Sequence, residues 1–318
     1  MSKVHPITRI PARWRASDIG DLRGKRFLIT GGTSGIGLES AREIARAGGD
    51  VIIAARDPIK AQRTTLSLGA SRVSWLEADL SNLLSIRSAA RKVEGEIDVL
   101  ILNAEIMAIP FMKSSDDLEM QMAVNHFGHF ALANLLREKI RDRVISVSSV
   151  AHKMGDFGSG SIDEIESRSR GDFEDLNMEY SPWRVYGASK LANILFTFEL
   201  ERLARKSGAS FISAVVHPGY SNTNLQYLAP ELSGDLRKVQ GMKIVNKIVA
   251  QSAAMGALPT LAAATIPGIS GGSFIGPGGI IEMRGHPKFV RARQLAYDQQ
   301  LARNLWHVSE EITGVKWS

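Results

Sequence analysis

The feature that most constrains the fold is an alternation of short apolar runs with longer helical patterns between residues 26 and 150. Each apolar run is nearly continuous, as expected for strands of a parallel sheet that helices cover on both faces. The alternation predicts an open, doubly wound α/β sheet with right-handed crossovers. The predicted strands are Arg26–Thr30, Val51–Ala55, Arg72–Leu76, Asp98–Leu102 and Val144–Val147, and the helices between them include Gly37–Ala47, Ser81–Val93 and Asp116–Lys139.

The second half of the chain is less regular. Residues 151–183 are polar and rich in Gly and Ser, and we interpret them as a long insertion loop with a short helix near Ile162–Glu166. Further predicted elements are a helix from Pro182 to about Lys206, a strand at Ser210–Val216, a substrate flap at 219–250, a helix at Ser252–Thr265 and a last strand near Ser273–Gly276. Because the sequence contains no internal repeat and no linker, we expect one α/β domain over 24–318, preceded by an N-terminal tail of residues 1–23.

A glycine-rich loop, Thr30–Gly37 (TGGTSGIG), lies between the first predicted strand and the first predicted helix. Glycines there permit a tight turn, a close approach of backbone to phosphate, and close packing of helix on strand. The N-terminus of the helix offers unpaired N–H groups and a partial positive charge to a pyrophosphate. The loop therefore predicts a dinucleotide site in a Rossmann fold, with contacts from Gly31, Thr33, Ser34, Gly35, Ile36 and Gly37.

The residue at the end of the second predicted strand bears on the choice of dinucleotide. An acidic residue there would bind the 2′-hydroxyl of the adenosine ribose, whereas an arginine suits a 2′-phosphate. Arg56 occupies this position, and Asp57 follows one residue later. We predict NADP(H) as the cofactor; the alternative is that Arg56 pairs with Asp57 or Glu77 at the surface.

A tyrosine and a lysine in the long predicted helix form a candidate proton-transfer pair. Tyr186 and Lys190 are four residues apart and therefore lie on one helical face. A nearby ammonium favours the phenolate, whose parent phenol has an ordinary pKa of about 10. Ser148 and Ser149 follow the fifth predicted strand, at the carboxyl edge where such sheets bind ligands.

Together these residues resemble the short-chain dehydrogenase/reductase family, from about residue 24 to residue 317. Within the family, the chain resembles the retinol dehydrogenase and WW-domain oxidoreductase-like branch and its bacterial relatives. The segments that carry this likeness are Ser148–Met154 (SSVAHKM), Tyr186–Leu200 (YGASKLANILFTFEL), His217-Pro218-Gly219 with Thr223, and Ser309–Trp317 (SEEITGVKW).

The resemblance implies a role for each matching residue. Tyr186 would protonate a carbonyl oxygen or deprotonate an alcohol, and Lys190 would lower the pKa of Tyr186 and hold the nicotinamide ribose. Ser149 would hydrogen-bond the substrate oxygen, and Asn125 would hold a water of a proton relay. Asp79 should contact the adenine amino group. Further cofactor contacts are implied for Leu80, Asn103, Ala104, Pro218, Gly219 and Thr223.

One position departs from the family pattern. After the fourth strand the family has Asn-Asn-Ala-Gly, whereas this chain has Leu102-Asn103-Ala104-Glu105. A carboxylate at Glu105 could repel the cofactor, clash with it, or point outward without effect.

Composition excludes several other classes of site. The chain has no cysteine, so disulfides, thiolate catalysis and Cys-ligated metals are excluded. His126 and His129 are spaced as a helical ligand pair, but with no third ligand in sight we expect them to pack and predict no metal. No apolar run is long enough to span a bilayer and no signal-peptide pattern begins the chain, so we expect a cytoplasmic protein.

Two hypotheses of function follow. The first is an NADP(H)-dependent oxidoreductase that interconverts an alcohol and a carbonyl on a small lipophilic substrate, with a flap near Tyr220–Gly241 lining the pocket. The second is a catalytically weak NADP-binding sensor or interaction protein on the same fold. The net charge of +6 is spread along the chain, which argues against a nucleic-acid partner. Family analogy suggests a homo-oligomer.

Overall fold

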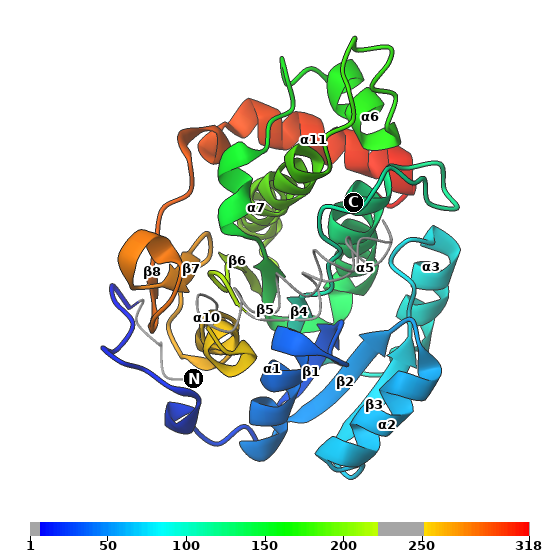
Figure 1. Ribbon diagram of the computed structural model, residues 1–318. Helices are drawn as coiled ribbons and strands as arrows, with labels where there is room; N and C mark the ends of the chain where they lie inside the picture. The colour runs from blue at the N-terminus through cyan, green and yellow to red at the C-terminus, as the bar shows by residue number, and fades with distance from the viewer. Residues whose placement is uncertain (1–6, 222–250, 318) are drawn as a thin grey trace, which may run out of the picture.

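The computed structural model describes residues 7–221 and 251–317, and these form an α/β structure around one eight-stranded sheet (Figure 1). The strands run in the order β3-β2-β1-β4-β5-β6-β7-β8, and β1 to β7 pair in parallel. Their bounds are Arg26–Thr30 (β1), Asp50–Ala55 (β2), Val73–Glu77 (β3), Ile97–Leu102 (β4), Ile140–Val147 (β5), Ile212–Val216 (β6), Phe274–Pro277 (β7) and Pro287–Phe289 (β8). The predicted doubly wound α/β fold is therefore confirmed.

Helices cover both faces of the sheet (Figure 1). On one face lie α1, α2 and α10, and on the other lie α3, α5 and α7, with α11 packed on α7. The helices are α1 (Gly35–Arg46), α2 (Pro58–Leu68), α3 (Leu83–Lys92), α4 (Met120–Met122), α5 (Gly128–Leu136), α6 (Ile162–Arg170), α7 (Pro182–Ser207), α10 (Ala253–Thr265) and α11 (Gln299–Thr313).

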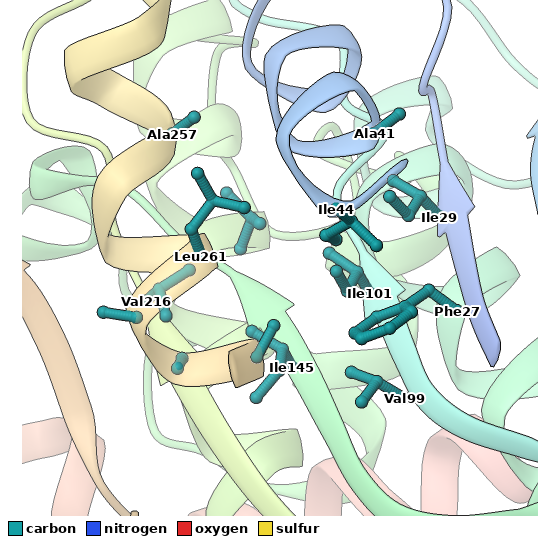
Figure 2. Close-up of a cluster of buried hydrophobic side chains, with 14 of the residues drawn as sticks. Phe27, Ile29, Ala41, Ile44, Val99, Ile101, Ile145, Val216, Ala257 and Leu261 are labelled. Carbon is teal, nitrogen blue, oxygen red and sulfur yellow. The ribbon is translucent and has the colours of Figure 1, made fainter. Parts of the chain in front are cut away.

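The apolar runs of the sequence divide between two hydrophobic cores because successive strand side chains point to opposite faces. In β4, Val99 and Ile101 pack toward α1 and α10, whereas Leu100 and Leu102 pack toward α3 and α5. Figure 2 shows the first core, where side chains of β1, β4, β5 and β6 surround Ile44 of α1 and Leu261 of α10. Burial on both faces explains why these strands read as continuous apolar runs.

The predicted helix Asp116–Lys139 begins later, at Met120, and is not α-helical throughout. It consists of α4, a π-helical turn at Ala123–Phe127, α5, and a 3₁₀ turn at Arg137–Lys139. A π turn inserts one extra residue into a helix, a local feature that apolar periodicity does not reveal and that is common at functional sites. This turn contains Asn125, a predicted site residue.

The segment predicted as an insertion loop contains more regular structure than its composition suggested. A 3₁₀ turn covers Val150–Met154, and α6 continues to Arg170, four residues beyond the predicted end. Two ion pairs at i,i+4 spacing, Glu164 with Arg168 and Glu166 with Arg170, extend α6 beyond its apolar residues.

The sheet also ends differently from the prediction. The antiparallel edge strand β8 follows β7 and was not predicted; it is three residues long and begins at a proline, which is tolerated at a sheet edge. The described part of the N-terminal segment packs on the molecule, because Trp14 is buried and its carbonyl accepts a hydrogen bond from His286.

No helix in residues 7–221 and 251–317 is long and apolar enough to cross a membrane.

Candidate active site

The predicted dinucleotide loop connects the carboxyl end of β1 to the N-terminus of α1. Gly31 adopts a left-handed conformation with φ +69°, and a Cβ at Gly37 would lie 2.5 Å from the Gly31 carbonyl oxygen, so this compact turn requires glycine at both positions. Ser34, the N-cap of α1, makes no side-chain cap, and neither does Ser181 at the start of α7, whereas α2, α3, α6, α10 and α11 are each capped by a side chain. The N–H groups at the start of α1 are therefore not capped by that serine, as an anion site requires.

The loop after β4 is held against the end of β1 by the Thr30 hydroxyl. Thr30 Oγ1 accepts hydrogen bonds from the N–H groups of Asn103 (2.8 Å) and Ala104 (2.9 Å). It also lies 2.9 Å from His129 Nε2, while His129 Nδ1 lies 3.1 Å from the Asn125 carbonyl oxygen. A carbonyl can only accept, so Nδ1 carries the proton and Nε2 accepts from Thr30. Burial lowers the pKa of His129 to about 3, consistent with this neutral ring.

Asn125 secures the same loop on its other side. Its Oδ1 accepts from the Ile106 N–H, and its Nδ2 donates to the Ile106 carbonyl and to Ser189 Oγ, each over 2.9 Å. The side chain is fully buried. These contacts clamp residue 106. The predicted role of Asn125 in holding a relay water stays a prediction.

Close packing of α7 brings the predicted serine to the predicted tyrosine. Ser149 follows β5 and begins the 3₁₀ turn Val150–Met154. A Cβ at Gly187 would lie 2.8 Å from the Ala151 carbonyl oxygen, so only glycine lets α7 lie this close to that turn. The packing places Ser149 close enough to Tyr186 to lower the pKa of the tyrosine.

Glu105 lies between the tyrosine and the lysine. The Tyr186 hydroxyl donates to Glu105 Oε2 over 3.1 Å, and the same oxygen forms an ion pair with Lys190 Nζ. Lys190 is buried, with its side chain 1% exposed, and it also donates to the Val147 carbonyl over 3.3 Å. Its Nζ lies 5.6 Å from the centre of the Tyr186 ring. The departure from the family pattern is thus at the centre of the site.

The surroundings of Tyr186 favour its protonated form. Burial raises the pKa of Tyr186 well above its usual value, and the neighbouring Glu105 carboxylate raises it further, whereas the hydrogen bond with Ser149 lowers it. Nearby His152 is neutral because burial lowers its pKa to about 4. Its Nδ1 donates to the Ser149 carbonyl over 2.6 Å and helps to fix that serine.

The remaining predicted cofactor residues follow other strands at the carboxyl edge. Arg56, after β2, makes no ion pair with Asp57 or Glu77 in the described part of the chain, and Asp57 instead caps α2 by accepting from the Lys60 N–H. Asp79 accepts from the backbone and side chain of Ser81.

Leu80, the next residue after Asp79, is buried. Pro218 and Gly219 follow β6, where Gly219 has φ +68°. Thr223 and nearly all of the predicted flap 219–250 lie outside the described residues.

Two side chains of the site were missed by sequence reasoning. Trp183, at the start of α7, is half exposed and stands edge-on to Tyr186 with ring centroids 6.0 Å apart. Its spacing of three from Tyr186 on a helix could have indicated this contact. The sequence indicated His129 only as a metal ligand or a packing residue, because its contact with Thr30 depends on tertiary structure. His126, its helical neighbour, instead contacts Ser309 Oγ at 2.8 Å.

Comparison with known proteins agrees with this geometry. Residues 25–161 match the short chain dehydrogenase family. The chain is 35% identical to human retinol dehydrogenase 14 over 96% of this chain and 91% of that protein, and 31% identical to human polyprenol dehydrogenase over 91% and 84%. The crystal structure of an uncharacterized protein from Mycobacterium paratuberculosis is similar with a TM-score of 0.79 and 36% identity, over 96% of this chain and 100% of that one.

The chain therefore belongs to the short-chain dehydrogenase/reductase family and is retinol dehydrogenase-like. It is an oxidoreductase of that family, acting on alcohol or carbonyl groups with a nicotinamide cofactor.

Proposed function

We propose that the protein is an NADP(H)-dependent oxidoreductase that interconverts an alcohol and a carbonyl on a small lipophilic substrate. The observation that carries this proposal is the convergence of Ser149, Tyr186 and Lys190 at the carboxyl end of β5, beside the glycine loop after β1. Ligands bind at this edge of doubly wound sheets. The uncapped N-terminus of α1 fits the pyrophosphate of a dinucleotide.

The proposed roles of the residues follow from their donors and acceptors. A bound nicotinamide supplies or accepts the hydride. Tyr186 would give its hydroxyl proton to a carbonyl oxygen during reduction, or accept the alcohol proton during oxidation. Ser149 would donate a hydrogen bond to the same oxygen and stabilise the charge that develops there. Lys190, buried one turn further along α7, would hold the cofactor ribose and stabilise the phenolate.

The preference for NADP(H) is supported by the end of β2. Arg56 has no acidic partner in the described part of the chain, so its guanidinium is available for a 2′-phosphate. Asp57, the acid that could have bound a 2′-hydroxyl, is engaged in capping α2.

A lipophilic substrate is supported by the surroundings of Tyr186 and by the relatives. Trp183 exposes half of its surface next to Tyr186 and offers an aromatic wall. Two relatives bear the names of lipid alcohols, retinol and polyprenol. Fold alone does not select a substrate, so the proposal is confined to this chemical class.

Calorimetric titration with NADPH and with NADH tests the cofactor, and a panel of lipophilic aldehydes and ketones tests the reaction. We expect tight NADPH binding, weak NADH binding, and NADPH oxidation with at least one carbonyl. Failure to bind either dinucleotide would refute the proposal.

A second candidate is a catalytically weak NADP-binding sensor or interaction protein. The observation in its favour is the pairing of Glu105 with both Tyr186 and Lys190. Tight NADPH binding, together with no NADPH oxidation by any carbonyl of the panel, would support the sensor or interaction protein.

A further inference from the structure

The position of Glu105 is fixed by its neighbours in the chain. On one side, the Ala104 N–H is bound by Thr30 Oγ1, and on the other, both backbone groups of Ile106 are bound by Asn125. The Glu105 side chain is only 15% exposed. Because Thr30 and Asn125 are both buried, they hold the backbone on either side of Glu105 firmly, and its carboxylate is directed toward α7.

A single carboxylate oxygen serves two partners. Glu105 Oε2 accepts from the Tyr186 hydroxyl at 3.1 Å and pairs with Lys190 Nζ. The hydroxyl hydrogen therefore points at the carboxylate, so the hydrogen bond exists only while Tyr186 is a phenol. A phenolate at the same distance would face a carboxylate of like charge, which opposes the stabilisation that the Lys190 ammonium offers.

The other titratable groups around this arrangement do not alter the balance at neutral pH. His129, from α5, lies near Lys190, and His152, from the 3₁₀ turn after β5, adjoins Ser149. Burial lowers the pKa of His129 to about 3 and that of His152 to about 4, so both rings are uncharged. The Glu105 carboxylate and the Lys190 ammonium are the charges in contact with Tyr186 among the described residues.

We propose that Glu105 is a positioning residue: by accepting hydrogen bonds from Tyr186 and Lys190 at one oxygen, it keeps the Tyr186 hydroxyl protonated. The inference rests on the proposed oxidoreductase function and adds how the proton of Tyr186 is held before the reaction. Reduction adds a hydride from the reduced nicotinamide to the carbonyl carbon and the Tyr186 proton to the oxygen. The phenolate then regains a proton from solvent. Oxidation needs the phenolate first and therefore becomes faster as pH rises.

The first test is ultraviolet titration of tyrosinate formation without cofactor. The chain has five tyrosines, and subtracting the Tyr186→Phe spectrum isolates the ionisation of Tyr186. In a Glu105→Gln background, with Tyr186→Phe again as the blank, we expect the ionisation of Tyr186 to move about one to three pH units lower, the effect of one charge in close contact. The matched control is Glu311→Gln, which breaks an exposed pair with Lys316 and should leave the titration unchanged.

The second test is the pH dependence of kcat/KM for oxidation. Wild-type kcat/KM for oxidation should rise with pH. In Glu105→Gln this rise should occur at lower pH, by the shift seen in the titration. A structural defect would lower kcat/KM without moving the rise. If Glu105→Gln does not fold, Glu105→Gly, which restores the family residue, serves as the second variant.

The two proposals fail in different ways. If Glu105→Gln moves neither the Tyr186 titration nor the rise of oxidation with pH, the inference about Glu105 is overturned even when turnover depends on Tyr186. A variant that only tightens NADPH binding would also overturn it, since Glu105 would then act by occupying cofactor space. If no carbonyl is reduced although the titration shifts, the oxidoreductase proposal fails while the effect of Glu105 on the protonation of Tyr186 is supported.

Discussion

Replacement of Asn125 by alanine tests whether this residue clamps the loop after β4. The Asn125 side chain is fully buried and makes three hydrogen bonds, two to the backbone of Ile106 and one to Ser189. Asn125→Ala removes all three and leaves the Ile106 N–H and carbonyl without their partners. The loop that carries Glu105 should become less stable together with the whole protein.

The magnitude follows from the number of bonds. A hydrogen bond contributes about 1 kcal/mol net, so the loss of three lowers the free energy of unfolding by about 3 kcal/mol. Asn134 offers a matched control because it is also buried but makes one bond, from Nδ2 to the Phe130 carbonyl, while its Oδ1 has no partner. Removing an unsatisfied polar atom offsets the lost bond, so Asn134→Ala should cost about 1 kcal/mol or less.

Urea unfolding followed by circular dichroism measures both variants, and steady-state kinetics measures their turnover. We expect Asn125→Ala to be less stable than Asn134→Ala by about 2 kcal/mol or more. Equal stability of the two variants would refute the role of Asn125 in holding the loop after β4. If Asn125→Ala were as stable as Asn134→Ala but lost turnover, a relay role for Asn125 would be favoured instead.

Four further predictions concern single residues. Tyr186→Phe should lower kcat by at least about a hundredfold with NADPH affinity nearly unchanged, and equal loss of both in calorimetry and kinetics would contradict its role as proton donor. Arg56→Asp should change the ratio of NADPH to NADH dissociation constants by about 10- to 150-fold towards NADH, the value of one charge-assisted hydrogen bond; an unchanged ratio would remove the argument for the 2′-phosphate. Glu105→Gly should hold or raise activity in the same assay, and a large loss would mean that the carboxylate has a direct role in turnover. Burial raises the pKa of Glu119 from its ordinary value of 4.5 to about 7. The stability that comes from this raised pKa is complete below pH 4.5 and is lost as pH rises through about 7. Glu119→Gln should therefore become more stable relative to wild type across that range, and a constant difference in urea midpoints would refute this prediction.

Much of the fold could be predicted from the sequence because it depends on local patterns. Strands buried on both faces need continuous apolar runs, and β1 begins and ends where its run does. The edge strand β8 escaped prediction because three residues with one proline carry no period. The π turn around Asn125 escaped because one inserted residue hardly disturbs an apolar pattern.

The sequence by itself determined the parts of the site whose spacing is local: the turn of the glycine loop, and the placing of Tyr186 and Lys190 on one face of α7. Only the tertiary structure decided where the Glu105 carboxylate lies. Its direction depends on Thr30, His129 and Asn125, which hold its loop from separate elements, and on the close approach of α7 at Gly187. Contacts between residues distant in the chain are set by packing, and neither propensity nor periodicity records them.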